Sequence, residues 1–417
     1  MPSAVPFQIV VVGGGIAGLC AAIALRGPGR QVTILEQSRL LSEIGATISL
    51  QPNASRILAK EWKLGAQLDK ADGMVDEGFR IFNVEGKMVN SVPLLSKTEY
   101  GGDRMMYHRQ DLHKALQAAA LDPDRSGPPA IVRTASRVAS CDCATGSVTL
   151  ESGEEIYGDV IVGADGIHSV LRDAVVGEHI NTIPTGLSAY RMVLPNSVLE
   201  QKCPTFCEHI KPREPATSMM MAHSCRLIMG PARQGDIFSI VGLVPDEKMN
   251  EDANQKQSWV SRGDLDKMLD TYRDFPEWMR DVFKQADDLG LWQLRDTDPL
   301  SAWTKGRVIL IGDAAHAMLP TQGQGASQAV EDAEALGAFF ADVDTVPSVE
   351  RVQQSLKEIV ECRYERASLI QKYSRDGAKP ATEKGSTEVK MSPADFMDYN
   401  CTYPGAKTWF ARQTAKA

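Results

Sequence analysis

The chain opens with alternating apolar runs that differ in their periodicity. Residues 8–12 are apolar and β-branched after Gln8, residues 16–26 have the composition of a helix, and residues 31–35 predict a second strand. A continuous apolar run is typical of a strand that is covered on both faces, as in a parallel sheet. This pattern predicts a strand–helix–strand unit and an α/β fold.

The change from a buried strand to a helix is repeated twice more. "VIVGADGIHSVLR" at 160–172 indicates a strand, a tight glycine turn and the start of a helix. "RVILIGDAAHAMLPTQGQGASQAVEDAEALGAFF" at 307–340 indicates a strand, a glycine-rich segment and a long helix. Because the strands are so apolar, we expect them to join the first two in one sheet.

The middle of the chain has a different pattern. Residues 188–195, 218–232 and 236–245 indicate strands with alternating or continuous apolar character. Residues 263–286 indicate two helices separated at Pro276, since proline interrupts a helix. We expect a second, mixed sheet here, followed by a return to the first domain.

Composition and charge narrow the functional classes. The net charge of −9 provides no basic surface for nucleic acid, so we expect no such partner. No apolar run is long enough to suggest a membrane span, and the first one does not resemble a signal peptide, so we expect a cytoplasmic protein. Eight cysteines are too few for a disulfide framework, and Cys203, Cys207 and His209 lack a convincing fourth ligand, so we expect no metal.

The first glycine turn indicates a dinucleotide site. Gly13, Gly15 and Gly18 form G-x-G-x-x-G between the first strand and the helix, and Glu36 follows the second strand. Such glycines allow a tight turn, close approach of the pyrophosphate and close helix packing, while the acid accepts a hydrogen bond from a ribose hydroxyl. Because an acid repels a 2′-phosphate, we expect NAD or FAD here and not NADP.

Three motifs together resemble one enzyme family. "GGGIAG" with Glu36, "GADGIHSVLR" and "GDAAHAMLPTQGQGASQAVEDA" occur in the order and spacing of the class A single-component FAD-dependent aromatic hydroxylases, such as salicylate, 3-hydroxybenzoate and 6-hydroxynicotinate hydroxylases. The resemblance covers about residues 7–375. It implies that the first motif binds the ADP part of FAD. The second glycine unit then serves NAD(P)H as it reaches the bound FAD, and it builds no second nucleotide domain.

The resemblance also implies a domain organisation. We expect an α/β protein with a Rossmann-like FAD-binding domain, a discontinuous mixed β-sheet substrate domain above the flavin and a helical C-terminal part. The expected ranges are 1–177 and 301–375 for the FAD-binding domain, 178–300 for the substrate domain and 376–417 for a C-terminal tail.

Further residues are candidates for the FAD site. Arg109 starts a helix from which it can reach the cofactor phosphates, although alone it would more often be an exposed helix residue. The resemblance places Gly45 and Ala46 beside the flavin, Asp165 at the shared cavity and Asp313 on the ribityl chain. Gly323 and Gly325 precede a helix whose amides can stabilise negative charge on the reduced flavin; the alternative is a surface loop that caps the helix.

The sequence specifies the substrate-binding residues less closely than the residues of the FAD site. Tyr190 and Arg191 match the family's aromatic–arginine strand motif, and Arg191 can pair with a substrate carboxylate or phenolate, or with a neighbouring acid. Ser49 occupies a position beside the flavin where hydroxynicotinate hydroxylases have a histidine. His223, a candidate base, and Arg226 are expected on the strand that faces Arg191. His316 is better interpreted as a packing residue.

The implied activity is that of an FAD-dependent, NAD(P)H-consuming monooxygenase. It would hydroxylate an electron-rich phenolic or aryl-carboxylate substrate with O2, through an oxygen adduct at flavin C4a, and act as a monomer or homodimer. The reductant is NADPH or NADH. An epoxidase, an oxidative dearomatase or a non-enzymatic flavin-binding protein are the alternatives. A halogenase is disfavoured because no W-x-W pair is present.

Overall fold

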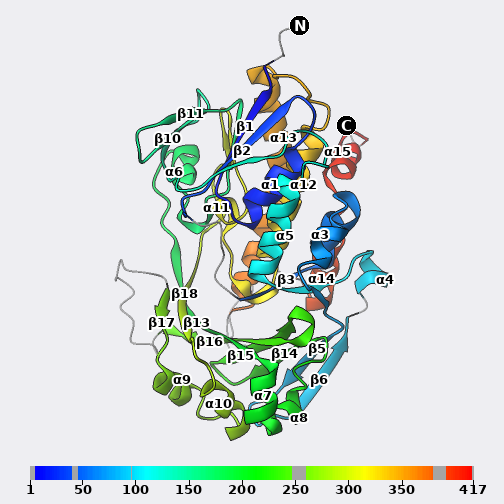
Figure 1. The fold of residues 1–417 in the computed structure, drawn as a ribbon, viewed down its shortest axis with the longest axis vertical. Coiled ribbons are helices and arrows are strands. Elements are labelled where there is room, and N and C mark those ends of the chain that lie inside the picture. Colours follow the sequence, from blue (N-terminus) through cyan, green and yellow to red (C-terminus); the bar gives the residue numbers. More distant parts are fainter. Residues whose placement is uncertain (1–4, 40–45, 95, 247–259, 379–390, 416–417) are drawn as a thin grey trace.

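The structure is a computed structural model that describes residues 5–39, 46–94, 96–246, 260–378 and 391–415. Two sheets dominate it, each with its own helices (Figure 1). In that view the N-terminal strands and the long helices form the upper part of the molecule. A large mixed sheet, coloured mainly green, forms the lower part.

The upper part contains a six-stranded sheet in the order β19-β20-β12-β1-β2-β8. Its parallel strands are β1 (Phe7–Val12), β2 (Arg30–Leu35), β8 (Ile131–Arg133), β12 (Val160–Gly163) and β20 (Val308–Leu310), and β19 (Thr304–Lys305) is antiparallel to β20. The predicted strand–helix–strand unit and its parallel sheet are therefore confirmed. The strands β1, β12 and β20 come from three distant segments and join because each is apolar enough to be buried on both faces.

Helices cover this sheet. They are α1 (Ile16–Leu25), α5 (Arg109–Leu121), α12 (Gly325–Phe339) and α13 (Val349–Asp376), of which α1 packs against both α5 and α12. The smaller α6 (Val170–Val176) packs beside a three-stranded sheet of β9 (Val138–Asp142), β10 (Ser147–Leu150) and β11 (Glu155–Tyr157). The C-terminal α14 (Pro393–Cys401) and α15 (Ala406–Thr414) pack back on the body, as their aromatic residues predict.

A second three-stranded sheet connects the two parts. It consists of β3 (Thr47–Leu50), β7 (Met105–His108) and β4 (Met74–Val75), with α2 (Pro52–Arg56), a π-helical turn (Ile57–Glu61), α3 (Gly65–Asp69) and α4 (Ser96–Tyr100) around it. Residues of β3 and β7 also contact β15 of the large sheet. Consequently the start of α5 lies at the boundary between the two parts.

The large sheet has eight strands in the order β17-β18-β13-β16-β15-β14-β5-β6. They are β5 (Gly78–Phe82), β6 (Met88–Pro93), β13 (Ile183–Pro195), β14 (Ala216–Met221), β15 (Arg226–Ala232), β16 (Ile237–Pro245), β17 (Val260–Arg262) and β18 (Gly290–Asp296). The strands predicted at 188–195 and 236–245 are present, whereas the predicted segment 218–232 forms two strands, β14 and β15, separated by a turn. The expected range of 178–300 was too narrow, however, because β5 and β6 also belong to this sheet.

One face of the large sheet is covered by α7 (Asn196–Lys202), α8 (Pro204–Ile210), α9 (Leu265–Thr271) and α10 (Glu277–Phe283). The predicted interruption at Pro276 separates α9 from α10. The opposite face meets the upper part, where Leu319 packs against Ala189, Leu243 and Leu294. Within the described ranges, no helix has both the length and the apolar composition that a bilayer crossing requires.

Candidate active site

The first glycine turn brings β1, α1 and β12 into close contact. Gly13 has φ +105°, and a Cβ there would lie 2.2 Å from the carbonyl oxygen of Ala164. A Cβ on Gly18 would lie 1.9 Å from the Gly13 carbonyl oxygen. Helix α1 begins after Gly15, which provides no side-chain cap, so the amides of its first turn remain directed at a ligand. Side chains at Gly13 and Gly18 are excluded by the backbone itself.

Glu36 stands at the end of β2 and is half-buried. Its Oε2 accepts a hydrogen bond from the Gly14 amide at 2.8 Å, and its Oε1 accepts one from the Ser38 amide at 2.7 Å. Each carboxylate oxygen can accept more than one hydrogen bond. The side chain is thus oriented beside the glycine turn while it retains capacity for a ribose hydroxyl.

The second and third motifs meet through Arg172 on α6. This arginine is 2% exposed, and its guanidinium donates to the carbonyl oxygens of Ile167 and Ala314, each at 2.8 Å, and of Asp313 at 2.7 Å. It also donates to the Gly166 carbonyl at 3.2 Å. One cation therefore joins the "DG" turn to the "GD" turn.

Asp165 in the "DG" turn has two unequal carboxylate oxygens. Its Oδ2 accepts from the amides of Val170 at 2.8 Å and Leu171 at 3.3 Å. Its Oδ1 is buried and has no hydrogen-bond partner among the described residues. Burial raises the pKa of this carboxyl above its usual range, although hydrogen bonds from Ser169 and the backbone oppose that effect.

The "GD" turn presents Asp313 to solvent. Gly312 has φ +57°, a left-handed conformation that favours glycine, and Asp313 begins the short helix α11 (Asp313–His316). Residues 308–317 are buried except for Asp313, which is exposed. A single exposed acid in a buried motif is what a ligand-facing acceptor requires.

Helix α12 starts beside this turn. A 3₁₀ turn (Pro320–Gln322) leads to Gly323, with φ +60°, and Gly325 is the first helical residue. A Cβ on Gly325 would meet no atom closer than 4.0 Å, so this helix end is open to a ligand. The structure is consistent with the expected role for these glycines.

The start of α5 supplies the remaining expected cofactor residues. Arg109 is the first residue of the helix, as predicted, and its amide donates to the Ala46 carbonyl at 2.8 Å. Ala46 is buried directly before β3, and Ser49 on β3 is half-buried and pairs with Met106 on β7. Gly45 lies outside the described residues.

The face of the large sheet that meets the upper part carries Arg191. On β13, Ala189 and Arg191 point to this face, because Ala189 contacts Leu319 of the "GD" segment and alternate residues of a strand share a face. The Arg191 guanidinium lies over the indole ring of Trp292 on β18, 4.8 Å from the ring centre. Burial and the charge of Arg109 lower the pKa of Arg191 to about 10, so it remains protonated at neutral pH.

Arg191 lacks a counter-ion in the described part of the chain. No carboxylate among these residues forms an ion pair with it, and its buried Nε has no hydrogen-bond partner there. Partial burial of a cation without an anion among the described residues is unfavourable unless a ligand supplies the charge.

Tyr190 does not lie on this face, which corrects its expected catalytic placement. It points into the opposite core with Met268 and Tyr272 of the covering helices and is fully buried. The physical reason is the alternation of side chains along a strand: Tyr190 and Arg191 are neighbours and must point to opposite faces. Burial and packing explain the tyrosine.

The expected placement of His223 and Arg226 also requires correction. His223 lies exposed in the turn between β14 and β15, not on a strand, and β16 separates β15 from β13. Arg226 shares the face of Arg191 through the register Arg226–Leu243–Ala189. Its guanidinium donates to the carbonyl oxygens of Gly377 and Ala378, both at 3.0 Å, so it ties the sheet to the end of α13.

Sequence reasoning missed Trp292 and Asp332. Trp292 is 101 positions beyond Arg191, and only the pairing of β13 with β18 brings them together. Asp332 belongs to the quoted third motif, but its contact with Gly312 depends on how α12 packs under the turn. His316, expected to be a packing residue, is indeed buried and lies against Trp303, with ring centres 5.2 Å apart.

The residues present fit FAD. The excluded Cβ positions at Gly13 and Gly18, the exposed Asp313 and the open start of α12 lie beyond the carboxyl ends of the parallel strands. Open α/β sheets bind ligands at this edge, beyond the carboxyl ends of their strands. The fold and site define a flavoprotein with a single dinucleotide-binding domain and a second sheet above it.

Comparison with known proteins confirms this class and narrows it. The model of the FAD binding domain family matches residues 6–348, so the chain belongs to that family. It is 32% identical over 355 residues to hispidin-3-hydroxylase of Neonothopanus nambi, covering 82% of each chain. It is 30% identical over 413 residues to 3-hydroxybenzoate 6-hydroxylase 1 of Aquipseudomonas alcaligenes, covering 94% of this chain and 96% of the relative.

A solved structure supports the same assignment. The structure of a salicylate hydroxylase substrate complex superposes with a TM-score of 0.75 at 26% identity and covers 91% of both chains. The expected resemblance to the class A aromatic hydroxylases is confirmed, and so are the α/β FAD-binding fold and FAD as cofactor. The protein is an FAD-dependent monooxygenase of this family.

Proposed function

We propose that this monooxygenase hydroxylates an electron-rich aromatic ring that carries a negatively charged group, either a carboxylate or a phenolate. The observation that carries the proposal is the half-buried Arg191 on the sheet face above the flavin motifs, which has no ion-pair partner among the described residues. A charge-assisted hydrogen bond from arginine is stronger and more directional than a neutral one, so such a group would be oriented as well as bound.

The roles of the cofactor residues follow from their positions. The glycine turn of α1 and Glu36 would hold the ADP part of FAD, Asp313 would accept from the ribityl hydroxyls, and Arg109 would face the phosphates. Gly323, Gly325 and the start of α12 would direct amides at the flavin ring. When bound, FAD supplies hydride acceptance from NAD(P)H and activation of O2.

The substrate side would combine an apolar surface with one cation. Ala189, Leu243, Leu294 and Leu319 form an apolar cluster at this boundary, and Trp292 adds an aromatic surface beside Arg191. Such a surface excludes water from the reacting ring, and Arg191 would direct the ring's charged substituent. Ser49 on β3 remains a candidate for contact with the substrate.

The relatives support this substrate class. The names of two of them specify 3-hydroxybenzoate and salicylate, which are both phenols with a carboxylate. The overall stoichiometry would be substrate, O2, NAD(P)H and a proton giving hydroxylated substrate, water and NAD(P)⁺.

We also propose that the protein acts in the cytoplasm as a monomer or homodimer. Its sparse cysteines, with no disulfide framework in the sequence, support the location.

The test uses the purified flavin-loaded protein. NADH and NADPH consumption is measured with charged and neutral pairs of one ring, such as salicylate against salicylamide and 3-hydroxybenzoate against 3-hydroxybenzamide, while peroxide is measured in parallel. The expected result is faster consumption with the charged member, little peroxide and incorporation of one ¹⁸O atom from ¹⁸O₂ into the product.

Three results would contradict the proposal. Equal stimulation by the neutral members would show that the substrate needs no anionic group. NAD(P)H consumption without ¹⁸O in the product would show that the substrate is not hydroxylated. No stimulation by any phenol or aromatic acid would overturn the aromatic substrate class and favour a non-aromatic one.

A further inference from the structure

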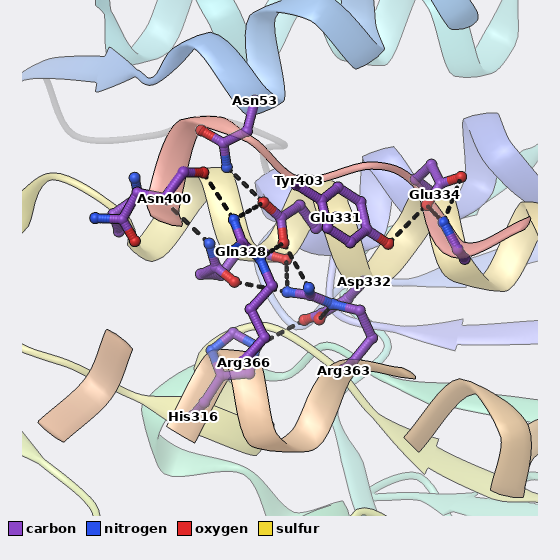
Figure 2. Close-up of polar contacts among 12 residues, drawn as sticks. Asn53, His316, Gln328, Glu331, Asp332, Glu334, Arg363, Arg366, Asn400 and Tyr403 are labelled. Atoms are coloured by element: carbon purple, nitrogen blue, oxygen red, sulfur yellow. Dashed lines mark hydrogen bonds and ion pairs between the residues drawn. The ribbon is translucent and has the colours of Figure 1, made fainter. Parts of the chain in front are cut away.

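A cluster of buried charged residues lies between α12 and α13 and is not used in the proposed reaction (Figure 2). Its acids are Glu331 and Asp332 on α12, and its cations are Arg363 and Arg366 on α13. Glu331, Asp332 and Arg363 are at most 1% exposed. Because burying charges is costly, such a cluster needs a reason beyond simple packing.

Asp332 lies against the "GD" turn. Its Oδ2 accepts a hydrogen bond from the Gly312 amide at 3.0 Å and is 2.6 Å from Nε2 of His316. Its Oδ1 accepts from Nε of Arg363 at 3.0 Å. Both ends of the α11 turn, Gly312 and His316, are therefore held by one carboxylate (Figure 2 shows His316, Asp332 and Arg363).

These contacts act on the conformation of the ligand-facing segment. Gly312 adopts φ +57°, and a Cβ there would lie 2.9 Å from Cβ of Ala17 on α1. In this conformation its amide points inward to Asp332, and the following residue, Asp313, is presented to solvent. A buried amide without an acceptor would favour a different turn.

Asp332 is ionised in the folded protein. Burial opposes ionisation, but His316, Arg363 and the Gly312 amide lower the pKa of Asp332 to about 2. A carboxylate is the strongest acceptor that a side chain offers to an amide and an imidazole at the same time. The negative charge of Asp332 therefore strengthens its contacts with the Gly312 amide and the His316 ring.

We propose that Asp332 is a positioning residue for FAD: by holding the Gly312 amide and the His316 ring, it sets the "GD" turn so that Asp313 faces the cofactor's ribityl chain. The inference rests on FAD binding at this edge. It does not depend on the identity of the substrate, so it can fail while the proposed function stands.

Glu334 on the same helix provides a matched control. It is buried like Asp332, but its carboxylate accepts from the Tyr403 hydroxyl at 2.9 Å and from the Ala406 amide at 3.0 Å, in the C-terminal segment. Figure 2 shows Tyr403 and Glu334 to one side of the Asp332 contacts. Replacing Glu334 tests the loss of a buried carboxylate on α12 without a direct change at the "GD" turn.

The experiment compares Asp332→Asn with Glu334→Gln in the full chain. FAD is removed and titrated back, and the dissociation constant is obtained from quenching of flavin fluorescence. The circular dichroism of the bound flavin in the visible range and the thermal unfolding of the FAD-free protein are measured as well. We expect Asp332→Asn to weaken FAD binding at least about tenfold, which is about 1.4 kcal/mol, and to alter the flavin spectrum.

The control result is also specified. We expect Glu334→Gln to keep the FAD dissociation constant within about twofold of that of the unchanged protein, whatever its effect on unfolding. Equal weakening by both variants, or tight FAD binding with an unchanged spectrum in Asp332→Asn, would overturn the proposal and leave Asp332 with a general structural role.

A second pair of variants applies if Asp332→Asn does not fold. His316→Phe keeps a ring against Trp303 but removes the nitrogen facing Asp332, whereas His316→Gln retains an N–H donor. We expect the phenylalanine variant to weaken FAD binding and the glutamine variant to restore most of it. Identical FAD affinity in both variants and in the unchanged protein would contradict the proposal.

Discussion

The guanidinium of Arg191 stacks on the indole ring of Trp292, with its central carbon 4.8 Å from the ring centre. The two residues come from adjacent strands of the large sheet, where Ala189 pairs with Trp292 and Arg191 pairs with Gly290. The indole ring of Trp292 therefore extends along β18 toward Gly290 and lies over the guanidinium of Arg191. This stack orients a half-buried cation that has no ion-pair partner among the described residues.

Replacing Arg191 by glutamine should weaken binding of an anionic substrate. Hydrogen bonds to charged groups contribute about 1.5–3 kcal/mol, so KM for the charged substrate should rise about ten- to a hundredfold. KM for a neutral analogue should change little. Steady-state NAD(P)H consumption with both members of a charged and neutral pair measures the difference.

Arg226→Gln is the control for this prediction. Arg226 lies on the same sheet face, but its guanidinium donates to two carbonyl oxygens near the end of α13. We expect the control to lower thermal stability and to keep the preference for the charged substrate. If Arg226→Gln alone lost that preference, the anion would bind at Arg226 and the assignment to Arg191 would be wrong.

Replacing Gly290 by alanine should displace the Trp292 ring. A Cβ at Gly290 would lie 2.1 Å and 2.2 Å from two carbons of the indole, Cζ3 and Cη2, so the ring has to move off Arg191. A cation–π contact contributes about 0.5–2 kcal/mol, which corresponds to a KM increase of about 2- to 30-fold.

The fluorescence of Trp292 and the fraction of reductant lost to peroxide report this change directly. Trp292→Phe, which retains an aromatic face, should be closer to the unchanged protein than Trp292→Ala. If both variants have the KM and coupling of the unchanged protein, the stack has no role in substrate binding.

Replacing Arg172 by lysine should loosen the contact between the "DG" and "GD" turns. The planar guanidinium reaches carbonyl oxygens in both turns, and a single ammonium group cannot reproduce that geometry. Leaving buried carbonyls without donors should cost about 2–4 kcal/mol of unfolding free energy and weaken FAD binding. Chemical denaturation and FAD titration measure the two effects.

Arg307→Lys is a suitable comparison for this prediction. Arg307 forms a partly exposed ion pair with Asp159 at 3.6 Å, and such pairs contribute about 0–1 kcal/mol. We expect a correspondingly small change. Similar destabilisation in both variants would mean that the bridging of the two turns by Arg172 is unimportant.

The stability of the protein should decrease in mildly acidic solution because of His108. This histidine is 6% exposed, and burial together with the charge of Arg233 lowers its pKa below the usual value, against the opposing effect of Asp111. Protonation therefore favours the unfolded chain: the contribution is present above about pH 6.5 and is lost as the pH falls through the folded-state pKa.

His108→Gln should consequently flatten the dependence of the melting temperature on pH below about 6.5. Thermal unfolding at a series of pH values, in the unchanged protein and the variant, measures this. His168 also has a lowered pKa, because of burial and the charges of Arg172 and Arg295, and so leaves a remaining slope in the variant. An identical slope in both proteins would contradict the assignment to His108.

Much of the FAD site could be predicted because its requirements are local. Gly13, Gly18 and Gly312 stand where a Cβ would meet a neighbouring atom or where φ is positive. Glu36 follows β2 directly, and Asp313 follows β20 after two intervening residues. A short stretch of sequence contains both the strand and the turn that such a site needs. The burial of the central strands on both faces, as in a parallel sheet, follows from their apolar composition.

The substrate face could not be predicted in the same way. Adjacent residues such as Tyr190 and Arg191 point to opposite faces, and a strand with apolar residues on both sides does not indicate which face meets the flavin. His223 was expected on a strand because the apolar pattern runs through the β14–β15 turn without a clear interruption. Likewise, nothing local to β5 and β6 indicates that they complete a sheet formed about a hundred residues later.

The sequence by itself determined the elements, the cofactor motifs and the family, because glycine turns and buried strands impose constraints over only a few residues. The tertiary structure decided which groups meet across the chain: Arg191 with Trp292, Arg172 with the carbonyl of Asp313, and Asp332 with the amide of Gly312. These contacts depend on strand order, register and helix packing. They form when whole faces of the sheets and helices are buried against one another, and a short stretch of sequence does not specify that packing.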